Sequence, residues 1–73
     1  MTPIRCDYSR SGGRIVGRCV ALDLESEPWF GRDRAEEEIV RLVLAKLTEQ
    51  QGQRVHFDDV VFVHAATMEA AAA

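Results

Sequence analysis

Residues 4–24 read IRCDYSRSGGRIVGRCVALDL, and this stretch decides the fold of the 73-residue chain. At its centre lies Gly12-Gly13, a pair that supplies the positive φ angles of a tight primed turn. The runs on either side, about 4–10 and 14–24, alternate apolar and polar residues as half-buried strands do. The stretch therefore predicts an antiparallel hairpin folded about the two glycines.

Counting outward from the turn predicts the register of this hairpin. The facing residues are Ser11 with Arg14, Tyr8 with Gly17, Asp7 with Arg18 and Cys6 with Cys19. The opposite charges of Asp7 and Arg18 are expected to stabilise the pairing by up to about 1 kcal/mol. Farther along, Val20, Leu22 and Leu24 alternate on the otherwise polar face. They predict either a bulge near Cys19 or cover by another subunit.

The residues after the hairpin predict one helix. Pro28 keeps it from starting early, and Asp33 with Glu36 has the spacing of a capping box. Three acidic residues, 36–38, suit the positive end of the helix dipole. Gly52 is expected to end the helix in the left-handed conformation. The inward apolar stripe comprises Ile39, Leu42, Val43 and Leu47, widened by Val40 and Leu44.

A final strand is predicted to begin at Arg54 or at Asp59. Its residues 60–63, VVFV, are continuously apolar, which is typical of a central strand buried on both faces. No short turn can pair it with the helix before it, so we expect it to lie beside the first strand.

These elements predict one two-layer α+β domain over residues 1–65. The hairpin and the third strand form one small sheet, and one amphipathic helix packs on a face of it, in the order β-β-α-β. Residues 66–73, rich in alanine, are expected to be a frayed tail.

Composition narrows the classes of function. The net charge is −3 and the basic residues are dispersed among acids, so no direct nucleic-acid binding is expected. No run has the length of a membrane span or the apolar core of a signal peptide, which favours a cytoplasmic location and no membrane partner. A core this small gains stability from self-association, so a homodimer or higher homo-oligomer is expected.

Cys6 and Cys19 are the first candidates for chemistry. Because they are predicted to lie directly opposite each other in the hairpin, they could form a disulfide, or bind zinc together with His56 and His64. Zinc ligands usually come in close pairs, however, and each of these residues stands alone in the sequence. Two buried thiols are therefore the expected state.

Other polar groups are weaker candidates for chemistry. His56 and His64 have no nucleophile or carboxylate at the spacing of a triad. Asp58-Asp59 could bind a cation with Asp23 or Glu25, but an acidic turn explains the pair equally well. We expect no catalytic residue, no metal ligand, no cofactor and no enzymatic activity.

Trp29-Phe30 lies in the connection between Pro28 and Gly31. Two large aromatic side chains in a loop either cover the end of the core or form a contact surface for a partner. Together with Val20 and Leu22, on the sheet face that the helix leaves open, they are the predicted partner-binding residues.

The chain resembles the HicB-like antitoxin family. That family shows a Gly-Gly hairpin, a strand ending in a Pro-Asp-Leu-like segment, then a Gly, a Thr-type cap and Glu-Glu at the start of an amphipathic helix. The matching positions are Gly12-Gly13, Asp23-Leu24, Gly31, Asp33 and Glu36-Glu37. The departures are Ala21-Leu22 in place of the Pro and Glu25-Ser26 in place of the usual Pro-Gly.

The resemblance implies a partial ribonuclease-H-like fold without nuclease residues. It also implies a non-catalytic module that sequesters a small, basic, RNA-cleaving protein. Many members add a C-terminal DNA-binding segment; none is recognised here, so regulation through DNA is not expected. Two alternatives stay open: a self-assembling structural subunit with no toxin partner, and a small metal or thiol protein.

Overall fold

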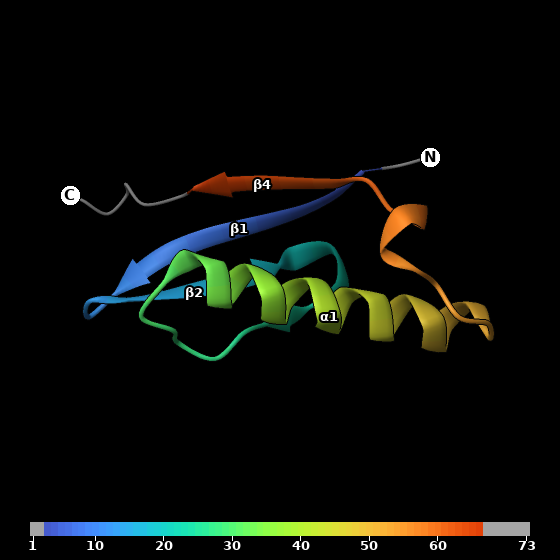
Figure 1. Cartoon of the computed structure of the whole chain (residues 1–73), viewed down its shortest axis with the longest axis horizontal. Coiled ribbons are helices and arrows are strands. Elements are labelled where there is room, and N and C mark those ends of the chain that lie inside the picture. Colours follow the sequence, from blue (N-terminus) through green and yellow to red (C-terminus); the bar gives the residue numbers. More distant parts are fainter. Residues whose placement is uncertain (1–2, 67–73) are drawn as a thin grey trace.

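The computed structural model describes residues 3–66, and these form one sheet with a helix packed on it (Figure 1). The elements in order are β1 (Ile4–Ser11), β2 (Arg14–Cys19), the 3-10 turn η1 (Val20–Leu22), β3 (Leu24–Glu25), α1 (Arg32–Gln51), η2 (Phe57–Asp59) and β4 (Phe62–Ala66). In the described part of the chain the sheet has four strands in the order β3-β2-β1-β4. β4 is parallel to β1, and the other neighbours are antiparallel. The predicted two-layer α+β fold is confirmed, with one strand more than expected.

The hairpin has the predicted turn and register. Gly12 and Gly13 have φ angles of 57° and 80°, which residues other than glycine rarely adopt. The observed pairs include Ser11 with Arg14, Tyr8 with Gly17 and Asp7 with Arg18.

The expected ion pair across the hairpin is replaced by two others. Asp7 accepts a hydrogen bond from Arg5 Nε at 2.8 Å, two residues away on the same strand. Arg18 Nη2 donates to Glu25 Oε2 at 3.0 Å, because Glu25 faces it from β3. The backbone register was predicted correctly, and the partners of these two side chains were not.

The second strand is shorter than predicted. It ends at Cys19, and the chain turns through η1 to Asp23, which has a left-handed φ of 56°. Leu24 then pairs back with Cys19 as part of β3. This reversal brings Leu22 and Leu24 against the core. The apolar alternation that suggested a bulge or a second subunit is thus a turn followed by a third antiparallel strand.

The helix begins one residue before the predicted cap. Gly31 is the N-cap, Asp33 lies in the first turn, and the predicted capping box of Asp33 with Glu36 is wrong. The side chain of Glu36 instead pairs with Arg32 at 3.4 Å. The predicted end is confirmed, with Gly52 as C-cap at a φ of 72°.

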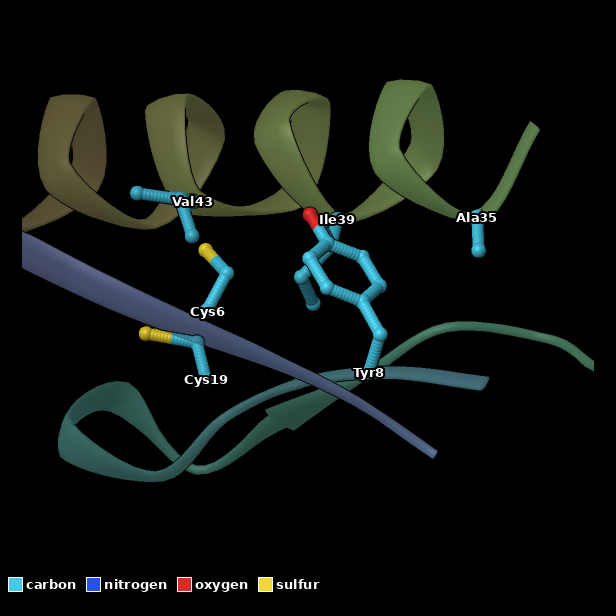
Figure 2. Close-up of a cluster of buried hydrophobic side chains, with 6 residues drawn as sticks. All are labelled: Cys6, Tyr8, Cys19, Ala35, Ile39 and Val43. Carbon is cyan, nitrogen blue, oxygen red and sulfur yellow. The ribbon is translucent and has the colours of Figure 1, made fainter. Parts of the chain in front are cut away.

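The core lies between α1 and the strands β1 and β2 (Figure 2). Its buried side chains are Cys6, Tyr8, Cys19, Ala35, Ile39 and Val43. Gly17 of β2 lies directly under the helix. A Cβ at this position would meet Tyr8 Cε1 at 3.1 Å and Ile39 Cβ at 3.3 Å, so the absence of a side chain allows the helix to approach the sheet closely.

The final strand is an edge strand, contrary to the prediction of a central one. It begins at Phe62, after the turn η2, and it pairs with β1 as expected. Val61 and Val63 remain 51% and 43% exposed, so the run is not buried on both faces. Of the predicted tail 66–73, Ala66 ends β4, and the rest lies outside the described residues.

Candidate functional site

Trp29 is fixed over one end of the core. Its backbone forms two hydrogen bonds with Ile15 of β2, of 2.6 and 2.9 Å. Its indole Nε1 donates to Glu38 Oε1 on α1 at 2.7 Å. The side chain is half-buried and packs against the core. Of the two roles predicted for Trp29, covering the core or contacting a partner, these contacts favour the first.

Phe30, the next residue, is 77% exposed. The Cζ of Arg14, from the hairpin, lies 4.4 Å from the centre of its ring. The Cζ of Arg34 lies 5.8 Å from the centre of the ring of the preceding residue, Trp29. We call these four residues the aromatic–arginine surface. It places two guanidinium groups over two aromatic faces, an arrangement that cation–π attraction favours.

The other two predicted partner-binding residues lie elsewhere. Val20 and Leu22 belong to η1, which follows the end of β2, whereas Trp29 pairs with Ile15 near its start. Val20 is exposed, and Leu22 is partly buried against the core. The four predicted residues therefore form two separate sites at opposite ends of β2.

Cys6 and Cys19 are free thiols, buried together under α1 (Figure 2). Burial raises the pKa of Cys6 to about 12, and the neighbouring Cys19 adds to this effect. Because the thiolate is the reactive form, a thiol with this pKa is a poor nucleophile near neutral pH. The expected role of the pair as core residues agrees with this environment.

The histidines proposed as zinc ligands do not approach the two cysteines as a group. His56 caps the turn η2, where its backbone N–H donates to Asp59 Oδ2 at 3.0 Å. His64 contacts Tyr8 and Glu36 instead. Within residues 3–66 there is no group of three or more His, Cys, Asp or Glu side chains arranged to hold a metal ion.

A polar cluster that the sequence analysis missed joins β1, β4 and α1. Tyr8 Oη lies 2.7 Å from His64 Nδ1, and that nitrogen lies 3.9 Å from Glu36 Oε2. Glu36 also pairs with Arg32, whose Cζ lies 4.6 Å from the centre of the Tyr8 ring. Burial raises the pKa of Tyr8 far above its usual value, so the phenol keeps its proton and can donate it in a hydrogen bond. No signal in the sequence reveals this cluster, because it depends on the parallel pairing of β4 with β1.

A second unpredicted contact fastens β3 to β2. Ser26 is buried, and its Oγ accepts a hydrogen bond from the backbone N–H of Gly17 at 2.8 Å. The same hydroxyl donates to the carbonyl of Glu27 at 2.9 Å. This small side chain therefore fixes the start of the connection that carries Trp29 and Phe30.

In the described part of the chain no helix combines the length and the apolar character that crossing a bilayer requires. Comparisons of the sequence with family models and with curated proteins, and of the structure with solved structures, gave no match.

Proposed function

We propose that the chain is a non-catalytic protein-binding module of the HicB-like antitoxin type. In this role it acts in the cytoplasm and sequesters a small RNA-cleaving protein, which docks on the aromatic–arginine surface. The observation that carries the proposal is the exposure of Phe30, 77%, beside a Trp29 that is held in place. The Gly-Gly hairpin and the amphipathic helix, which formed part of the family resemblance, are both present in the fold and agree with this proposal.

An exposed phenylalanine on a rigid support is well suited to protein recognition. Phe30 directly follows Trp29, whose backbone is paired with Ile15 and whose indole is bound to Glu38. Little conformational entropy is then lost when a partner covers the ring. Aromatic and arginine side chains are also the types that contribute most to binding energy at interfaces.

The charge of this surface specifies the part of the partner that contacts it. Arg14 and Arg34 flank the two rings. A partner that is basic overall would therefore dock through a segment that carries carboxylates, since these pair with guanidinium groups. As a homodimer or larger homo-oligomer the module would present the surface more than once, which raises avidity for a paired partner.

A retention and inhibition experiment tests this function. The tagged chain is used to isolate bound proteins from its native host, and a retained small protein is purified and assayed for RNA cleavage. The expected result is stoichiometric inhibition of cleavage by the chain. Phe30→Ala should raise the Kd at least about tenfold, the effect of losing one well-placed aromatic contact.

Val20→Ala is the matched control. Val20 is also an exposed apolar residue, but it lies in η1, at the opposite end of β2 from the residue that pairs with Trp29. Its substitution should leave the Kd unchanged. Retention of no ribonuclease would contradict the proposed class of partner, and equal effects of the two substitutions would contradict the proposed surface.

A further inference from the structure

The two edges of the sheet differ in how they are protected against pairing with another strand. β3 is two residues long and carries Glu25, which is paired with Arg18. The other edge is β4, and residues 60–66, VVFVHAA, contain no Lys, Arg, Asp, Glu or Pro. Folded proteins usually protect an edge strand by shortness, charge, proline or a bulge. The β3 edge has two of these features, shortness and charge, whereas β4 is a regular strand of mainly apolar residues.

The backbone of β4 is oriented to accept a further strand. The N–H of Ile4 donates to the carbonyl of Val61 at 2.8 Å, so the backbone groups of Val61 face β1. Successive residues of a strand direct their N–H and C=O groups to opposite edges. The groups of Val63 therefore also face β1, and those of Phe62 and His64 face the open edge.

We propose that a second copy of this chain pairs with β4 in an antiparallel manner, about a two-fold axis at Val63. Val63 then lies opposite Val63 of the second copy, at a non-hydrogen-bonded position. Phe62 lies opposite His64 of the second copy, and these residues exchange backbone hydrogen bonds. The interface is isologous, so that one surface supplies both halves.

The side chains suit this register on the outer face of the sheet. Val61 and Val63 are 51% and 43% exposed on the face away from α1. In the pair, Val61 lies opposite Ala65 of the second copy, and all six outward residues of the two strands are apolar. Pairing buries them together, and no like charges are brought face to face.

The side chains on the helix side of β4 also suit the proposed register. Phe62 stacks on His64 at 5.9 Å between ring centres, and on Phe57 at 5.7 Å. α1 packs over β1, β2 and β3, so β4, the strand that carries Phe62 and His64 of this aromatic row, lies beside the helix rather than beneath it. The row of one copy would meet that of the other through the pairs of Phe62 with His64. Aromatic pairs across strands stabilise antiparallel sheets.

The pairing of two copies does not depend on the proposed ribonuclease-binding role. It uses β4, whereas Phe30 follows the residue that pairs with β2. A chain that dimerises without binding a ribonuclease would support the pairing and contradict only the proposed function.

Site-directed cross-linking of the full chain tests the register. Val63→Cys places a thiol opposite itself at a non-hydrogen-bonded position, where Cα atoms are about 4.5 Å apart and a disulfide can close. Val61→Cys is the matched control, because its counterpart on the second copy is four residues along and roughly 13 Å away. Under mild oxidation Val63→Cys should give a covalent dimer and Val61→Cys should not. The native Cys6 and Cys19 are fully buried, and the unsubstituted chain reports any cross-linking through them.

Light scattering and sedimentation test the pairing itself. The unsubstituted chain should have twice the monomer mass of 8.2 kDa. Val63→Asp sets two carboxylates face to face and should give a monomer, whereas Val20→Asp, on the exposed turn η1, should remain a dimer. Far-UV circular dichroism establishes whether each variant folds. If Val63→Asp does not fold, the comparison of Val63→Cys with Val61→Cys tests the pairing instead. A monomeric unsubstituted chain, or cross-linking at Val61 equal to that at Val63, would overturn the proposal.

Discussion

The hydroxyl of Tyr8 lies 2.7 Å from Nδ1 of His64, and this contact joins the first strand of the sheet to the last. The two residues are 56 positions apart in the sequence, and they meet because β4 is parallel to β1. Since the phenol keeps its proton, it can donate to the ring nitrogen whenever that nitrogen is unprotonated. The hydrogen bond therefore helps to hold an edge strand that contacts the rest of the sheet on one side.

Tyr8→Phe should lower the free energy of unfolding by about 1 kcal/mol, the usual net value of one hydrogen bond. The substitution retains the buried ring, and His64 can be hydrated because its side chain is 26% exposed. Urea unfolding followed by the fluorescence of Trp29 measures the change. A double-mutant cycle with His64→Ala should give a coupling of about 0.5–1.5 kcal/mol. A coupling of zero would mean that the two side chains act independently.

Gly17→Ala should destabilise the domain by about 1–3 kcal/mol, the usual cost of overpacking a core. The added Cβ would lie 3.1 Å from Tyr8 Cε1 and 3.3 Å from the carbonyl oxygen of Ala35, and backbone cannot move aside easily. Gly31→Ala is the control, since nothing lies within 4 Å of a Cβ at that position. Its cost should stay below about 1 kcal/mol, the effect of a poorer N-cap. Similar losses at both sites would show that the close approach at Gly17 is not decisive.

The parts of the fold that rest on local signals were predictable from the sequence. The turn at Gly12 and Gly13 determines the hairpin register by counting, and the spacing of apolar residues determines which face of α1 is buried. Gly52 likewise marks the end of the helix. Each of these features depends on a few neighbouring residues and on backbone angles that the residue type itself favours.

Two errors concern local signals, the capping box at Asp33 and the turn at Asp23, and the others concern features that depend on distant residues. At Asp23 the chain adopts a left-handed conformation that is uncommon for a residue with a side chain, so a turn there was not expected. The apolar run of β4 does not reveal which of its faces is covered, and only the sheet order does so. Trp29 and Phe30 were singled out from the sequence as candidate partner-binding residues. Their arginine neighbours were not, because the pairing of Trp29 with Ile15 brings Arg14 to that end.

Stability should fall as the pH rises above about 9, because of the buried thiol of Cys6. Its pKa is 9.0 in an exposed state and is raised to about 12 in the fold. Between these values the unfolded chain has lost the proton that the folded chain keeps, so unfolding releases a proton and is favoured by alkali. The midpoint of urea unfolding, measured from pH 7 to 11, should decrease from about pH 9 upward.

Cys6→Ala isolates the thiol in this experiment. The variant should be less stable at pH 7, since it leaves a small cavity, but its stability should fall less steeply above pH 9. Tyr8, whose pKa is also raised by burial, still contributes a fall of the same sign above pH 10. An unchanged slope in the variant would show that Cys6 is not the source of the alkaline sensitivity.

Glu38→Ala should cost about 1.5–3 kcal/mol, the range for hydrogen bonds to a charged group. Glu38 Oε1 accepts from Trp29 Nε1 at 2.7 Å and from the backbone N–H of Glu27 at 3.0 Å, so one carboxylate holds the connection at two points. Trp29 is the only tryptophan of the chain, and its emission should shift to longer wavelength as the indole becomes more exposed.

The adjacent Glu37→Ala is the matched control for this substitution. Glu37 is exposed, and the structure of residues 3–66 gives its side chain no hydrogen bond or ion pair. Its removal should change stability by less than about 0.5 kcal/mol and leave the emission of Trp29 unaltered. Because Trp29 positions Phe30, only Glu38→Ala should also weaken binding at the aromatic–arginine surface. Equal binding by the two variants would mean that Phe30 binds the partner whether or not Glu38 holds Trp29 in place.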